Sequence, residues 1–283
     1  MPETRSLMLK MRDGTDIHCV DYFPASPAHS GIVFMHGLGE HSGRYAHVAD
    51  YFCARGFAVR TYDHRGHGKS SGKRGDIPHP DSLLDDAQQV MHDWQASCPT
   101  SVTRHLLLGH SMGGLFAAKF ALSKMCALDG LILSAPALAI YMNFVERSLL
   151  KVLSAIAPAL TLSNGLKTTY LSHDPKVVAS YLADPLVHDR ISARLLNSML
   201  TTMHDVFSHV SSLDLPTLLL LAGQDKLVDS TGSLRFAQAS PENYLRLHAY
   251  NNLYHEIFNE LDAKAVFDDV STWLDQLSNT VVQ

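Results

Sequence analysis

Short apolar runs alternate with amphipathic stretches along the first half of the chain. Strand-like runs rich in aliphatic and β-branched residues occur at 32–35, 57–62, 105–108 and 131–133. Between them, apolar residues recur with helical spacing at 45–54, 83–95 and 112–122. Such alternation is typical of parallel strands joined by crossover helices. The pattern therefore predicts an α/β protein with a mostly parallel sheet and helices on both faces.

Both ends of the chain extend this architecture. Near the N-terminus, the runs 6–10 and 17–23 flank a turn that contains Asp13 and Gly14, which predicts an antiparallel hairpin. Toward the C-terminus, the pattern resumes with strand-like runs and a final amphipathic stretch, at 217–221, 244–248 and 264–277.

The alternation is interrupted in the middle of the chain. From about Ala137 to Ser211 no comparable strand pattern occurs, and Pro, Asn and Gly separate helical patches at 146–156 and 191–203. Because the alternation resumes afterwards, we expect a helical cap, or lid, inserted into a single α/β core. The predicted core comprises residues 1–137 and 211–283, and the predicted cap comprises residues 138–210.

Composition places the chain among ordinary folded proteins. Of its 283 residues, 46% are hydrophobic and 18% are charged, which excludes collagen-like, coiled-coil and largely disordered chains. A net charge of -5 provides no long-range attraction to nucleic acid, so no nucleic-acid partner is expected. The charged N-terminus lacks the apolar core of a secretory signal, and no apolar run reaches the roughly 20 residues of a spanning helix. We therefore expect a cytoplasmic protein.

Residue types that commonly bind metals show no suitable spacing. The four cysteines are far apart and form no CxxC pair; they are Cys19, Cys53, Cys98 and Cys126. The pair His255-Glu256 does not begin a zinc-binding helix, because Asn259 stands where a second histidine is required. No metal and no cofactor are expected.

A GxSxG motif lies between an apolar run and an Ala-rich helical pattern. Gly109, Ser111 and Gly113 form the motif directly after the run 105–108. In this context the motif predicts a sharp strand-to-helix turn that raises Ser111 out of the sheet as a nucleophile. The Met112 N–H then lies at a helix start, where free donors favour negative charge. The alternative interpretation is a chance match of three small residues.

A serine nucleophile requires a base, and the base requires an acid that orients it. Asp225 and His255 each follow a predicted strand, so both are expected in loops at the carboxyl edge of the sheet. Asp229 is an alternative acid, although its position also suits the cap of a helix. The predicted catalytic triad is Ser111, His255 and Asp225.

A tetrahedral intermediate also requires a second hydrogen-bond donor beside Met112. The glycine-rich sequence from His36 to Glu40 follows the run 32–35. In α/β folds with a GxSxG turn the second donor comes from the loop after an earlier strand, which predicts the Leu38 N–H. The alternative is an ordinary turn.

The predicted cap carries an apolar stripe whose role the sequence leaves open. Stripes of this kind usually pack onto a core. If exposed, this one would allow peripheral contact with a membrane. Its members are Leu149, Leu150, Val152, Leu153, Ile156 and Leu160.

Three longer strings resemble a known family. They are MHGLGEHSGRY at 35–45, DHRGHGKS at 63–70 and GHSMGG at 109–114. These strings are similar to those of the α/β-hydrolase fold family that includes monoacylglycerol lipases and lysophospholipases, and the resemblance covers nearly the whole chain. It implies the same triad and the same oxyanion donors. The chain departs from the family at Phe258, where some monoacylglycerol lipases carry a further histidine.

The resemblance implies a small-molecule lipid ester as substrate. It also implies that polar side chains hold the glycerol head, namely Glu40, Arg44, His110 and Tyr181. For Glu40 and Arg44, a salt bridge that stiffens the oxyanion loop is an equally open alternative. We expect a cofactor-free serine hydrolase that cleaves carboxylic esters of single-chain lipids, with monoacylglycerol lipase as the leading hypothesis. Lysophospholipase, broad carboxylesterase, acyltransferase and non-catalytic small-molecule receptor are the alternatives.

Overall fold

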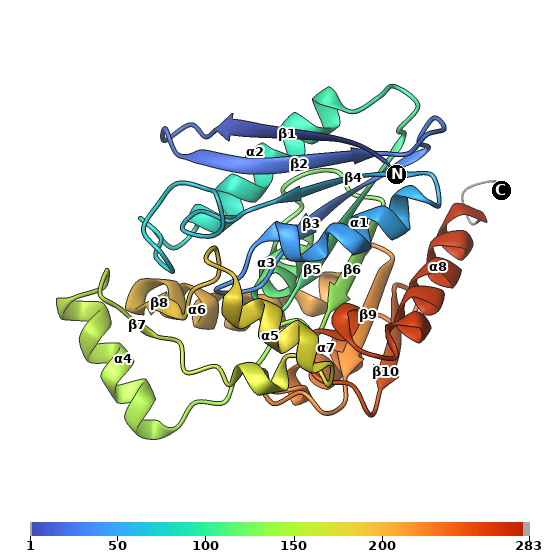
Figure 1. Cartoon of the computed structure of the whole chain (residues 1–283). Helices are drawn as coiled ribbons and strands as arrows, with labels where there is room; N and C mark the ends of the chain where they lie inside the picture. Colours follow the sequence, from blue (N-terminus) through green and yellow to red (C-terminus); the bar gives the residue numbers. More distant parts are fainter. Residues whose placement is uncertain (1, 280–283) are drawn as a thin grey trace.

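An eight-stranded sheet runs through the protein in the order β1-β2-β4-β3-β5-β6-β9-β10 (Figure 1). The structure is a computed structural model that describes residues 2–279. β1 pairs antiparallel with β2, and β2 with β4, whereas every other pair is parallel. The predicted hairpin and mostly parallel sheet are confirmed. The strands are β1 Glu3–Lys10, β2 Asp16–Phe23, β3 Ser30–Met35, β4 Phe57–Tyr62, β5 Arg104–His110, β6 Gly130–Ser134, β9 Thr217–Ala222 and β10 Leu245–Tyr250.

Alternate residues of each strand build a separate apolar core on each face of the sheet. In β5, Leu107 belongs to one core, whereas Leu106 and Leu108 belong to the other. Helices α2 and α3 cover the first core, and α1 and α8 cover the second. The helices outside the central part of the chain are α1 Ala46–Cys53, α2 Ser82–Ser97, α3 Met112–Leu122, α7 Thr231–Ala239 and α8 Ala263–Asn279, with 3-10 turns η1 Ser42–Tyr45 and η4 Ile257–Asn259.

The segment between β6 and β9, residues 135–216, is where the sequence predicts an insertion. Its helix α4 lies at the outer edge of the molecule, whereas α6 packs on α3 through Leu195, Met199 and Met203 (Figure 1). The last helix of the insertion is therefore part of the first core. The elements of the insertion are α4 Phe144–Ile156, β7 Thr161–Ser163, η2 Thr168–Tyr170, α5 Pro175–Ala183, β8 Arg190–Ser192, α6 Ala193–His209 and η3 Val210–Ser212.

The insertion differs from the expected purely helical segment. β7 and β8, with three residues each, pair antiparallel. Strands of this length are too short for an alternating pattern to be recognised. The nine-residue helices α5 and α7 also give no clear sequence signal, because they span few turns. Among residues 2–279, no helix combines the length and the apolar character that crossing a bilayer requires.

Candidate active site

Ser111 occupies the sharp turn between β5 and α3. Its backbone has φ 54° and ψ -120°, a conformation that residues with a side chain rarely adopt. Hydrogen bonds hold it there: the Ser111 N–H donates to the Ser134 carbonyl at 3.0 Å, and the Ala137 N–H donates to the Ser111 carbonyl at 2.9 Å. The turn predicted from the GxSxG motif is present.

Gly113 allows this turn to pack directly against the end of β3. A Cβ at Gly113 would collide with the backbone carbonyl oxygens of Met35 and His36. These oxygens belong to the chain just before the oxyanion loop, residues 37–40. The glycine of the motif therefore sets the close approach between the nucleophile turn and that loop.

His255 and Asp225 form a buried pair in the loops after β10 and β9. The His255 Nδ1–H donates to Asp225 Oδ2 at 2.6 Å. The other carboxylate oxygen of Asp225 accepts the N–H groups of Leu227 and Val228 at 2.9 and 3.0 Å. Asp229, the alternative acid, instead accepts the Thr231 N–H at the start of α7. Of the two candidates, Asp225 is the one that contacts the imidazole.

The charges around His255 favour its protonated form. Burial by itself lowers the pKa of His255, but Asp225, followed by Glu256 and Glu40, raises it above the usual value. Burial raises the pKa of Asp225, yet the interactions with His255 and two backbone N–H groups lower it overall. His110 lies with its ring centroid 4.8 Å from that of His255. Burial, and then the charge of His255, hold the pKa of His110 well below its ordinary value.

Ser111 and His255 line the same cavity, which has a volume of about 360 Å³. Within residues 2–279, the His255 side chain is hydrogen-bonded to Asp225, and no hydrogen bond joins it to the Ser111 hydroxyl. In unliganded enzymes such bonds often tighten only when substrate is bound. Ser111 and His255 are therefore both open to a molecule bound in this cavity.

Two backbone N–H groups lie beside Ser111, those of Leu38 and Met112. Leu38 and Met112 both line the cavity, and in the described part of the chain neither N–H donates a hydrogen bond. A Cβ placed on Gly37 would lie 3.2 Å from Ser111 Cβ, so the oxyanion loop adjoins the serine. Free donors at this place suit a developing oxyanion.

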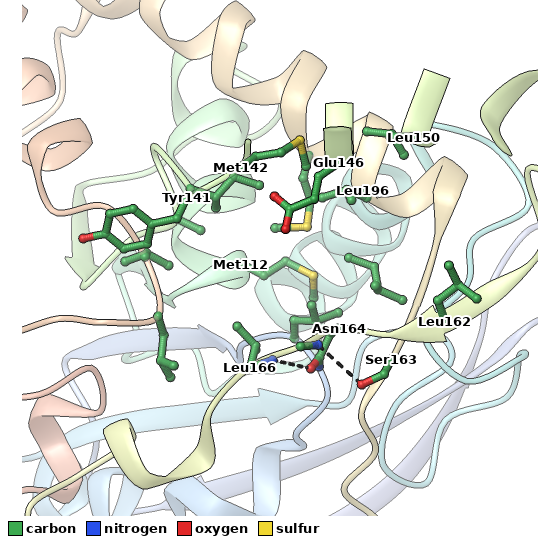
Figure 2. A pocket seen from close by; sticks show the side chains of 18 of the residues that line it. Met112, Tyr141, Met142, Glu146, Leu150, Leu162, Ser163, Asn164, Leu166 and Leu196 are labelled. Atoms are coloured by element: carbon green, nitrogen blue, oxygen red, sulfur yellow. Dashed lines mark hydrogen bonds between the residues drawn. The ribbon is translucent and has the colours of Figure 1, made fainter. Parts of the chain in front are cut away.

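The rest of the cavity wall is mainly apolar and comes largely from the insertion. Figure 2 shows Met112, Met142 and Leu196 around it, with the Glu146 carboxylate among them. Polar groups from the β7 segment, Ser163 and Asn164, also contribute. Across residues 2–279, no three His, Cys, Asp or Glu side chains gather in a way that would hold a metal ion.

Comparisons with known proteins identify the family of the chain. The profile of the family described as serine aminopeptidase, S33 (Hydrolase_4), matches residues 26–262. The chain belongs to this α/β-hydrolase family. The sheet order, the hairpin and the surrounding helices are those of the α/β-hydrolase fold.

Individual relatives of this hydrolase are similar over most of their length. A monoacylglycerol lipase of Mycolicibacterium smegmatis is 33% identical, covering 86% of this chain and 87% of the relative. The phospholipase YtpA of Bacillus subtilis is 30% identical, covering 87% and 95%. The crystal structure of a Paleococcus ferrophilus monoacylglycerol lipase superposes with a TM-score of 0.84 at 32% identity, covering 92% of this chain and 99% of that one.

The structure places the four residues predicted to hold a glycerol head outside the cavity wall. In this hydrolase Glu40 and Arg44 are paired with each other at 2.5 Å. Tyr181 lies under the Arg44 guanidinium, 4.7 Å from ring centroid to Cζ. His110 Nδ1 contacts the Ser134 hydroxyl at 3.2 Å. The salt bridge that was the alternative for Glu40 and Arg44 is present in the structure.

Two segments of the insertion hold the loops of the site, which the sequence did not indicate. The His188 N–H donates to the Gly39 carbonyl at 2.8 Å, and the Glu256 N–H donates to the Leu171 carbonyl at 2.8 Å. Gly39 has φ 78°, and a Cβ there would collide with the His188 carbonyl oxygen. The glycine-rich string was a signal of such a close approach, but its partner, 149 positions later, carries no recognisable motif.

Proposed function

We propose that this chain, a carboxylic ester hydrolase, cleaves esters of single-chain lipids and that a monoacylglycerol is its preferred substrate. The observation that carries the proposal is the cavity: Ser111, His255, Leu38 and Met112 all line it, and most of the remaining wall is apolar. A fatty chain requires such a wall, and an ester requires the polar end.

The proposed reaction proceeds through an acyl-enzyme. His255 removes the Ser111 hydroxyl proton as the serine oxygen attacks the ester carbonyl, and Asp225 stabilises the resulting imidazolium. The N–H groups of Leu38 and Met112 hold the oxyanion. His255 then protonates the departing alcohol, and in the second half it activates water, which releases the fatty acid.

Charge at the cavity supports a neutral head group. Glu146 lines the cavity beside the apolar residues, so an anionic phosphate would meet a like charge there. A monoacylglycerol has no such charge. The relatives named above are themselves divided between a monoacylglycerol lipase and a phospholipase, so lysophospholipid hydrolysis is the second candidate.

The proposed cap, residues 138–210, also provides a surface for lipid. Val145, Val152 and Ile156 recur on α4 with helical spacing and are 72%, 54% and 75% exposed. The neighbouring residues Leu150 and Leu153 line the cavity. An exposed apolar stripe beside the substrate cavity supports peripheral contact of α4 with a membrane that contains the substrate.

Comparing substrates tests the proposal. We expect kcat/KM to be highest for a monoacylglycerol, lower for lysophosphatidylcholine and lowest for p-nitrophenyl acetate, with Ser111→Ala inactive on all three. A preference for the acetate over both lipids would exclude the lipid function.

Labelling and product analysis separate the remaining alternatives. A fluorophosphonate should form an adduct on Ser111 of the parental protein and none on Ser111→Ala. Absence of an adduct on the parental protein would favour a non-catalytic receptor. Ester products formed with added alcohol, in preference to free fatty acid, would favour an acyltransferase.

A further inference from the structure

Arg44 is the centre of a buried ionic cluster that includes Glu256, the residue next to His255. Its guanidinium contacts Glu40 Oε2 at 2.5 Å and makes a bidentate contact with Glu256, at 2.6 and 2.8 Å. The side chains of Arg44, Glu40 and Glu256 are only 9%, 4% and 2% exposed. Such a cluster is held at a desolvation cost, so it is a specific arrangement rather than a surface ion pair.

Each end of the cluster is attached to a loop that carries a reacting group. The Gly37 N–H donates to Glu40 Oε1 at 2.5 Å, and Gly37 directly precedes Leu38, the oxyanion donor. Glu256 directly follows His255, the base. These two loops follow β3 and β10, which β5, β6 and β9 separate in the sheet. The cluster therefore connects two parts of the site that the sheet holds far apart.

We propose that Arg44 and Glu256, together with Glu40, are positioning residues that hold the oxyanion loop and the His255 loop in register for acyl transfer. This inference rests on the proposed function. It assigns Glu40 and Arg44 a role that acts through Leu38 and His255, without contact with the substrate. Glu256 is a residue that the sequence motifs did not single out for catalysis.

The cluster also contributes charge. Glu40 and Glu256 share one guanidinium, and burial, helped by the charge of Glu256, raises the pKa of Glu40. The titratable groups that face His255 are Asp225, Glu256, Glu40 and His110, with Arg44 behind them. The pKa of His255 is raised by Asp225 first and by Glu256 and Glu40 after it, against the lowering effect of burial. Removal of the Glu256 charge therefore disfavours the imidazolium that forms during attack.

The variant Glu256→Gln keeps the shape of the side chain and removes its charge. The readout is the second-order rate of Ser111 labelling by a fluorophosphonate between pH 5 and 9. We expect a plateau rate reduced by about tenfold, because misplacement of catalytic groups by a fraction of an ångström slows reaction to about this degree. We also expect the acidic limb to move to lower pH. A merely structural role would lower thermal stability without moving that limb.

A second variant separates position from charge. Arg44→Lys keeps the positive charge. A lysine ammonium lacks the planar guanidinium, so it cannot bind two carboxylates in the same geometry. We expect slower labelling with the acidic limb unchanged. Should Glu256→Gln fail to fold, the Arg44→Lys comparison carries the test. Glu242→Gln, an exposed residue near the opposite end of β10, is the matched charge control and should label as the parental protein does.

The outcomes distinguish this inference from the proposed function. A parental protein that no fluorophosphonate labels contradicts the proposed function itself. A labelled parental protein whose Glu256→Gln and Arg44→Lys variants react at its rate and with its pH profile overturns only the positioning role. Variants that raise KM for a monoacylglycerol but label normally would show that the cluster contacts substrate, which also overturns it.

Discussion

The imidazole of His255 donates its Nδ1–H to Asp225 at 2.6 Å, whereas Asp229, four residues further on, is paired with the start of α7. Two acids of one loop thus have different partners. The Asp225 carboxylate fixes the tautomer of His255 that leaves Nε2 free to accept a proton.

The two acids are expected to differ sharply when neutralised. Asp225→Asn should lower kcat by about 10⁴-fold, because the amide no longer stabilises the imidazolium. Asp229→Asn is the matched control and should leave kcat unchanged, with a loss of stability of at most about 1 kcal/mol. Steady-state kinetics and urea unfolding of both variants measure the difference. Equal losses of activity would place the acid elsewhere.

The backbone of Ser111 should store measurable strain. At φ 54° a side chain is unfavourable, so Ser111→Gly should be more stable than Ser111→Ala by about 1 kcal/mol. Both variants lack the nucleophile, and both should therefore be inactive, with kcat lower by about 10⁴-fold or more.

Ser123 provides the control for that comparison. It is exposed and has φ -84°, where glycine brings no relief. There the alanine variant should be the more stable of the two. If glycine and alanine rank in the same order at both positions, the strain at Ser111 is absent. Chemical unfolding gives all four free energies.

Buried neutral histidines should make the protein sensitive to acid. Burial, followed by neighbouring charges, holds the pKa values of His36, His67 and His110 well below 6.5, and burial lowers that of His64 from 6.5 to about 4. When the pH lies between the pKa of such a histidine in the folded protein and its pKa in the unfolded chain, only the unfolded chain binds the proton. The stabilisation is therefore complete above about pH 6.5 and is lost as the pH falls toward the folded pKa.

The loss from His64 alone should reach about 3 kcal/mol near pH 4. Guanidinium unfolding at pH 7.5, 6 and 5 measures the slope. His64→Gln should reduce it, and the exposed His204→Gln should not. A free energy of unfolding that stays constant over this range would contradict the prediction.

The exposed stripe of α4 should govern binding to lipid but not the chemical step. Val145→Ser combined with Val152→Ser and Ile156→Ser should reduce flotation with phosphatidylcholine vesicles that contain monoacylglycerol, because it removes apolar area from the interface. Hydrolysis of p-nitrophenyl acetate should be unchanged, since none of the three residues lines the cavity. Met8→Ser, an exposed apolar residue on the edge strand β1, is the control. Vesicle binding equal to that of the parental protein would exclude α4 as the contact surface.

Local sequence was sufficient to predict most of the sheet and the positions of Ser111, Asp225 and His255 in the fold. Short apolar runs predicted β3 to β6, and apolar residues with helical spacing predicted α1 to α3. The turn at Ser111 was predictable because its glycines and its nucleophile are adjacent in the chain. The placement of Asp225 and His255 followed from the rule that parallel strands end at one edge. Their hydrogen bond confirms the pairing, while the catalytic roles stay predictions.

By itself, the sequence therefore determined the fold class, the turn at Ser111 and the loops that carry Asp225 and His255, since each depends on short-range pattern. Only the tertiary structure decided which charges pair. Arg44 and Glu256 are 212 positions apart, and no periodicity records a contact over that separation. The same applies to the contact between Gly39 and His188. It also applies to α4, whose residues Leu150 and Leu153 line the cavity while Val152 and Ile156 are exposed. Such relationships depend on how distant segments pack, which local propensity does not specify.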